Sequence, residues 1–205
     1  MTVLAIRPEH NSLGRKDVTG AFEPEAEKWI EMHGGKVVTV DCRTLVSKPK
    51  RREQVYFALQ DHAGLNFDAV GFFCHGGKKW LQPGFDWTDL DDLAIGIAMV
   101  SRADIRVALY ACNCATGDLE NFASRLRDAL VRRFPASVQV DAHHGKGHCT
   151  ERPYVRRYTG PEHSGGQWIV MPKTLAWYKW TKLLEGDLRM RYPFMTVPEI
   201  HKTMP

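Results

Sequence analysis

Two apolar stretches decide the fold of this chain: residues 67–74 read FDAVGFFC, and residues 105–111 read IRVALYA. Their length and their β-branched and aromatic content are typical of buried strands. The first stretch runs directly into His75-Gly76-Gly77, and the second runs directly into Cys112. Because one helical pattern separates them, we expect two neighbouring parallel strands that bring His75 and Cys112 to the same edge of a sheet.

Strand-like and helix-like segments alternate on both sides of this pair. Further strands are expected over residues 2–6, 36–40, 138–142 and 167–171, with helices over 22–33, 51–62, 89–102 and 119–134. Such alternation predicts a three-layer α/β/α domain with a mainly parallel sheet of roughly six strands. We expect this domain to span residues 1–172 and a helical or irregular extension, residues 173–205, to pack on it. Residues 10–20, 78–88 and 145–166 are expected to be irregular.

The composition is that of an ordinary globular protein. Of the 205 residues, 43% are hydrophobic and 25% are charged. There is no run of ~20 apolar residues that could cross a membrane, and the first residues lack the pattern of a secretory signal. Five cysteines with irregular spacing then predict reduced thiols in a cytoplasmic protein.

The net charge of +4 is unevenly distributed. Residues 1–150 carry 19 basic and 19 acidic side chains, whereas residues 151–205 carry 9 and 5. This excess is too small to indicate a nucleic-acid-binding surface. We therefore do not expect nucleic acid as a partner, and the oligomeric state stays open.

A cysteine and a histidine at one sheet edge are sufficient for nucleophilic catalysis. The Cys112 thiolate can attack a carbonyl carbon, while the His75 imidazole accepts and later returns a proton. The glycines that follow His75 allow backbone N–H groups to approach a developing oxyanion. These features predict an enzyme that works through a thioester intermediate.

The segments Val70–Gly76 and Val107–Cys112 resemble the two motifs of the caspase-like cysteine peptidases. That group includes caspases, metacaspases, legumains, gingipains, separases and the CHAT-type bacterial proteases. The order of strands and helices over about residues 1–142 is similar as well. The resemblance implies a peptide or protein substrate and no cofactor.

The same resemblance implies a role for each matching residue. His75 would be the general base, Cys112 the nucleophile, and the backbone N–H groups of Gly76 and Cys112 the oxyanion hole. Metacaspase-type enzymes carry an acidic residue two positions before the cysteine, where this chain has Tyr110. The acidic residue that usually supports specificity for a basic side chain of the substrate is therefore absent at this position.

Cys114 is an alternative nucleophile, because Cys114-Ala115-Thr116-Gly117 can be aligned on the same family pattern. We favour Cys112, since the preceding apolar run ends at Ala111 without a gap. We also expect a helix to begin near residues 116–119 and to lower the pKa of the Cys112 thiol through its N-terminal N–H groups. Cys114 is then expected to serve packing.

The strand over residues 138–142 leads into a loop that is rich in histidine. Asp141 and His143 lie where that strand ends, and we expect them to contact the substrate. His143, His144, His148 and Cys149, together with Cys112 and Cys114, offer ligand types that zinc prefers. Their spacing matches no closed structural zinc site, so we expect no metal.

Two other functions remain open. His10, Glu25 and His75 loosely resemble the zinc ligands of N-acetylmuramoyl amidases, which polarise a bound water. The amidase hypothesis gives no role to Cys112 at the end of its strand. The chain could instead be a binding module that keeps the caspase-like fold and has lost catalysis.

Overall fold

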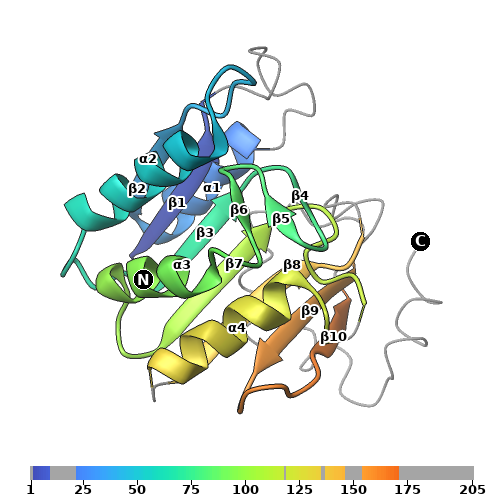
Figure 1. The fold of residues 1–205 in the computed structure, drawn as a ribbon. Helices are drawn as coiled ribbons and strands as arrows, with labels where there is room; N and C mark the ends of the chain where they lie inside the picture. The colour runs from blue at the N-terminus through green and yellow to red at the C-terminus, as the bar shows by residue number, and fades with distance from the viewer. Residues whose placement is uncertain (1, 10–21, 118, 135–136, 146–153, 171–205) are drawn as a thin grey trace, which may run out of the picture.

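The computed structural model describes residues 2–9, 22–117, 119–134, 137–145 and 154–170 (Figure 1). Its helices are α1 (Phe22–His33), α2 (Lys48–Asp61), α3 (Leu90–Val100) and α4 (Phe122–Arg133). Its longer strands are β1 (Val3–Pro8), β2 (Gly35–Val40), β3 (Ala69–Phe73), β7 (Ile105–Tyr110), β8 (Val138–His143), β9 (Tyr154–Thr159) and β10 (Gln167–Val170). Three two-residue strands are β4 (Gly76–Gly77), β5 (Trp80–Leu81) and β6 (Phe85–Asp86).

The long strands form one sheet of seven in the order β10-β9-β8-β7-β3-β1-β2. Strands β2, β1, β3, β7 and β8 run parallel to one another. Strand β9 is antiparallel to β8, and β10 is antiparallel to β9. The short strands form a separate antiparallel sheet beside the ends of β3 and β7 (Figure 1). The expected α/β class and mainly parallel sheet are confirmed.

Helices cover both faces of the parallel part of the sheet. On one face, Trp29 of α1 packs on Phe73, with ring centroids 5.4 Å apart. A methyl group at Gly71 would lie 2.7 Å from the Trp29 ring, so glycine is required for this close approach. On the other face, Val70 and Phe72 join a core built with α2, α3 and α4. Alternate residues of β3 therefore face different helices.

Helix α4 shows how local sequence sets an element boundary. Asn121 accepts a hydrogen bond from the Ser124 backbone N–H, and the Ser124 side chain accepts one from the Asn121 N–H. This reciprocal capping box satisfies two donors that a helix start leaves free. The buried side chains Leu126 and Leu130 then hold the helix against the sheet.

Two expectations about the strands are corrected. The sheet has seven strands because residues 154–159, expected to be irregular, form β9. Two adjacent arginines interrupt the apolar pattern of this strand. Arg156 is nevertheless buried, since it is only 6% exposed. Residues 78–88 include the short strands β5 and β6, which are too short to produce a periodic signal.

Helix α2 packs one face on the core. Val55 and Leu59 face the core, whereas Phe57 is 56% exposed. A residue two positions along a helix lies on its far side, so Phe57 cannot share the face of its neighbours. At 14 residues α2 is the longest described helix, and no helix within the described ranges is long and apolar enough to cross a bilayer. The irregular segment expected at 10–20 and the extension expected at 173–205 lie outside the described residues.

Candidate active site

The parallel pairing of β3 with β7 brings the two predicted site residues to one edge of the sheet. Phe73 is the register partner of Tyr110, and the Cys74 N–H donates to the Tyr110 carbonyl at 3.2 Å. His75 and Cys112 each follow two residues after this matched pair. The expected adjacency of the two strand ends is confirmed.

The segments that carry these residues are in direct contact. A methyl group at Gly76 would lie 2.8 Å from the Ala111 Cβ and 2.8 Å from the Cys114 Sγ, so a larger residue would clash. His75 and Cys112 themselves are half-buried. The strand ends are therefore packed together, while both reactive side chains keep some exposure.

The backbone of His75 is held by Gln82, which follows β5. The His75 N–H donates to Gln82 Oε1 at 3.0 Å, and the Gln82 N–H donates to the His75 carbonyl at 2.9 Å. Gly76 pairs with Leu81 at the next position of the same ladder. Because hydrogen-bonded and non-hydrogen-bonded pairs alternate in antiparallel strands, the Gly76 N–H is directed away from β5. Its role as an oxyanion donor stays a prediction.

Cys112 lies in a turn that is tied to the end of β8. Asn113 has a left-handed backbone (φ 59°), and its N–H donates to the Gly145 carbonyl at 2.7 Å. The Ala115 N–H donates to the His143 carbonyl at 3.0 Å, and the Thr116 hydroxyl donates to the His144 carbonyl. Hydrogen bonds to a neighbouring strand end thus fix this turn.

The expected helix start near residues 116–119 is wrong. Helix α4 begins at Phe122, and the Ala123 N–H in its first turn donates to the Cys114 carbonyl at 3.0 Å. The Asn121 side chain caps another N–H of that turn. The loop that follows Cys112 therefore already supplies hydrogen-bond acceptors to N–H groups at the start of the helix.

Cys112 differs in exposure from the other described cysteines, since Cys42, Cys74 and Cys114 are buried. Burial raises the pKa of the Cys42 thiol to about 12 and raises those of Cys74 and Cys114 as well. A thiol must lose its proton to act as a nucleophile. This difference favours Cys112 over Cys114 and agrees with a packing role for Cys114.

Asp141 and His143, the predicted substrate contacts, are both buried at the end of β8. The Asp141 carboxylate accepts from Arg157 Nε at 3.0 Å and from Gln139 Nε2 at 2.6 Å. Desolvation by burial outweighs the Arg157 charge and raises the pKa of Asp141 to about 6. Their contact with a substrate stays a prediction.

An aromatic row runs across the sheet beside these residues. The His143 ring packs edge-on against the Tyr110 ring at 5.2 Å, and Tyr110 packs on Phe73 at 5.7 Å. Tyr110 stands where metacaspase-type enzymes carry an acidic residue. Here its ring fills the space between two neighbouring strands.

Cationic and aromatic side chains surround the loop after Cys112, and among them only His144 stood out in the sequence. Arg156 Nη1 donates to the Gly117 carbonyl at 2.6 Å, and its guanidinium lies 4.8 Å from the Trp168 ring. The His144 ring lies 4.6 Å from the same indole, and burial together with the Arg156 charge lowers its pKa. Lys78 approaches Gly117 as well, since its Nζ would lie 3.4 Å from a methyl group there. This edge of the sheet is therefore basic.

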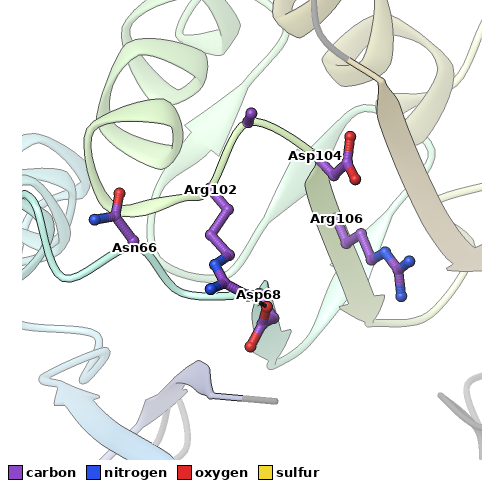
Figure 2. Close-up of a pocket in the computed structure, with 6 residues that line it drawn as sticks. Asn66, Asp68, Arg102, Asp104 and Arg106 are labelled. Carbon is purple, nitrogen blue, oxygen red and sulfur yellow. Dashed lines mark hydrogen bonds and ion pairs between the residues drawn. The ribbon is translucent and has the colours of Figure 1, made fainter.

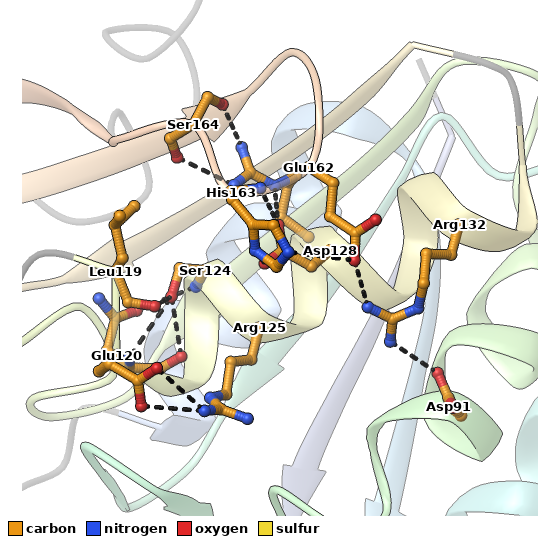
Figure 3. Close-up of polar contacts among 12 residues, drawn as sticks. Asp91, Leu119, Glu120, Ser124, Arg125, Asp128, Arg132, Glu162, His163 and Ser164 are labelled. Atoms are coloured by element: carbon orange, nitrogen blue, oxygen red, sulfur yellow. Dashed lines mark hydrogen bonds and ion pairs between the residues drawn. The ribbon is translucent and has the colours of Figure 1, made fainter.

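A second polar cluster, which we call the α4 cluster, comprises Asp128, Arg132, Glu162 and His163, which Figure 3 labels, together with Arg127, which pairs with Asp128. Within the described part of the chain, Asp128, Glu162 and His163 are the one group whose possible metal-ligand atoms lie within 4.8 Å of one another. Arg127 Nε contacts Asp128 at 2.6 Å, and Arg132 contacts Glu162 at 2.6 Å. Two cations already balance the two carboxylates, so this cluster reads as a structural link.

The metal ligands considered from sequence do not assemble among the described residues. Cys112, Cys114, His143 and His144 belong to no such group. His148 and Cys149 lie outside the described residues, as do His10 and the side chain of Glu25. The zinc hypotheses stay untested.

A hollow of about 730 Å³ lies at the amino ends of β3 and β7, opposite the carboxyl ends that lead to His75 and Cys112 (Figure 2). Its lining includes Asp68, whose carboxylate accepts from Arg102 at 2.6 Å and from the Thr2 N–H. Open α/β sheets bind ligands beyond the carboxyl ends of their strands. The position of this hollow therefore does not favour it as the active site.

Comparison with known proteins finds no matching family model and no matching curated protein. The candidate site has a half-buried cysteine and a half-buried histidine at adjacent strand ends. The Gly76 N–H points away from β5, and basic side chains lie nearby. A thiol and an imidazole are the types of group that nucleophilic attack on a carbonyl carbon requires.

Proposed function

We propose that this protein is a caspase-like cysteine peptidase with Cys112 as nucleophile and His75 as general base. The observation that carries the proposal is the parallel pairing of β3 and β7, whose ends lead to His75 and Cys112. The strand order β2-β1-β3-β7-β8, with helices on both faces, supports a three-layer caspase-like arrangement.

The reaction begins when His75 accepts the Cys112 thiol proton and the thiolate attacks the carbonyl carbon of a peptide bond. The resulting oxyanion receives hydrogen bonds from the backbone N–H groups of Gly76 and Cys112. Collapse breaks the C–N bond, and the His75 imidazolium gives its proton to the departing amine. A thioester on Cys112 remains.

Hydrolysis of the thioester restores the enzyme. His75 removes a proton from water, and the resulting hydroxide attacks the thioester carbonyl. The second tetrahedral intermediate expels the Cys112 sulfur, which recovers its proton from His75. The products are a carboxylic acid and an amine.

The test compares thiol alkylation with metal chelation on a mixed library of fluorogenic peptides. Iodoacetamide should abolish turnover and label Cys112, which is found by peptide mapping, whereas EDTA should leave the rate unchanged. A zinc amidase would show the opposite pattern. Absence of turnover on every peptide would favour the catalytically silent binding module.

A further inference from the structure

We propose that Gln82 is a positioning residue for His75, an inference that rests on the proposed function. Gln82 is 5% exposed and binds both backbone polar groups of His75. Its side-chain Oε1 accepts from the His75 N–H at 3.0 Å, and its own N–H donates to the His75 carbonyl at 2.9 Å. One residue therefore holds the backbone from which the imidazole projects.

The side chain of Gln82 takes over a role that a main-chain carbonyl would have. In a regular antiparallel ladder, the Gln82 carbonyl would accept the hydrogen bond from the His75 N–H. That carbonyl instead faces α2, where Arg51 Nη1 lies 3.4 Å away. The amide oxygen of Gln82 replaces it and extends the pairing of β4 with β5 by one residue.

The burial of Gln82 shows what its amide contributes. Its Nε2 is buried and has no hydrogen-bond partner among the described residues. The amide cannot be turned round, because Nε2 would then oppose the His75 N–H, donor against donor. An unpaired buried N–H is destabilising, so an apolar side chain of the same length would serve packing equally well. The contact with His75 is the specific contribution of glutamine at this position.

This hold matters because the next residue is packed against the other half of the site. A methyl group at Gly76 would lie 2.8 Å from the Ala111 Cβ and 2.8 Å from the Cys114 Sγ, so this backbone is close to the segment that carries Cys112. A shift of the His75 backbone would therefore change the direction of the imidazole relative to the Cys112 thiol. Displacements of about 1 Å at a reacting pair can reduce rates by about 10²-fold.

Three variants test the role of Gln82. Gln82→Met removes the acceptor and preserves length, whereas Gln82→Glu keeps an acceptor and adds a charge. Arg52→Met is the matched control, because Arg52 holds the same small sheet through the Gly84 carbonyl at 2.7 Å and does not contact His75. Circular dichroism establishes that each variant is folded.

Gln82→Met should lower kcat about tenfold while KM stays within about twofold, because the reacting pair is misaligned and substrate binding is not. Exchange of the His75 amide hydrogen, followed by NMR, should be about fivefold faster once its acceptor is gone. Gln82→Glu should recover most of kcat and move the acidic limb of the pH–rate profile upward, since a nearby negative charge favours protonated imidazole. Arg52→Met should leave these readouts unchanged.

The rate of Cys112 alkylation against pH separates failure of this inference from failure of the proposed function. If His75→Ala changes that profile and Gln82→Met does not, the Cys–His pair exists and the positioning role of Gln82 is overturned. If His75→Ala leaves the profile unchanged and the wild type cleaves no peptide, the proposed function fails and the inference fails with it. If the wild type cleaves no peptide but both variants shift the profile, Gln82 positions His75 in a site with a different reaction.

Discussion

The ends of β3 and β7 and the α4 cluster both gather titratable side chains, but they use them differently. In the α4 cluster, the Arg127 guanidinium is fully buried and binds Asp128, the Thr159 carbonyl and Ser164. At the strand ends, His75 and Cys112 are half-buried, and backbone hydrogen bonds hold the segments that carry them. A cluster of opposite charges that balance each other stabilises a fold, whereas a nucleophile and a base on rigid backbone are suited to chemistry.

The largest expected effect is the loss of activity in Cys112→Ala. We expect turnover to fall by about 10⁴-fold or more, because the attacking group is absent. The free energy of unfolding should change by less than about 1 kcal/mol, since the thiol is half-buried. Peptide turnover and urea denaturation provide the two measurements.

Cys114→Ala is the matched control, and we expect its activity to stay within about threefold of wild type. His75→Ala should lose nearly as much activity as Cys112→Ala, because the members of a catalytic unit are not additive. An active, folded Cys112→Ala protein would identify Cys114 as the nucleophile. The proposed difference between the strand ends and the α4 cluster would then no longer rest on Cys112.

The α4 cluster should behave in the opposite way. Arg127→Met should destabilise the fold by about 3 kcal/mol, because it removes the buried cation that pairs with Asp128 and that donates to the Thr159 carbonyl and to Ser164. Turnover per folded molecule should be unchanged. Arg125→Met, which removes the exposed pair with Glu120 and the contact of its guanidinium with the Trp87 ring, should cost less than about 1 kcal/mol. A selective loss of kcat in folded Arg127→Met would assign the α4 cluster to the reaction.

Asp141 allows a pH test of a buried ion pair near the candidate site. Its pKa is raised from 3.8 to about 6, so the folded state binds more protons than the unfolded state between these values. Stability contributed by Asp141 is therefore present at low pH and lost as pH rises through this window, by about 3 kcal/mol.

Asp141→Asn should remove this part of the pH dependence. Wild type and variant are compared by urea denaturation from pH 3.5 to 7, and the variant should gain stability relative to wild type as pH rises. Parallel curves would show that Arg157 compensates the Asp141 charge fully, as the arginines of the α4 cluster compensate theirs.

The smallest expected effect lies in the turn after Cys112. Asn113 has a φ of 59°, which glycine adopts freely and β-branched residues rarely do. Asn113→Gly should change stability by less than about 1 kcal/mol, whereas Asn113→Val should cost about 2 kcal/mol and lower turnover. Equal turnover in a folded Asn113→Val protein would show that this turn does not need its precise backbone for activity.

Much of the sheet follows from local patterns. The apolar runs that form β3 and β7 are long enough to be recognised, and one helix between them requires parallel neighbours. Strand β9 escaped recognition because Arg156 and Arg157 interrupt its apolar pattern. The arginine side chains find partners in other segments, so their burial cannot be read from their neighbours in the sequence.

The sequence by itself determined the alternation of strands and helices and the placement of His75 and Cys112 at adjacent strand ends, because periodicity and chain connectivity are local properties. Only the tertiary structure decided that Cys114 is buried while Cys112 is half-exposed, that Gln82 holds His75, and that α4 begins at Phe122. Burial and hydrogen-bond partners depend on segments that are distant along the chain and meet only after folding. The two residues proposed to react were therefore visible in the sequence, whereas the contacts that hold them were not.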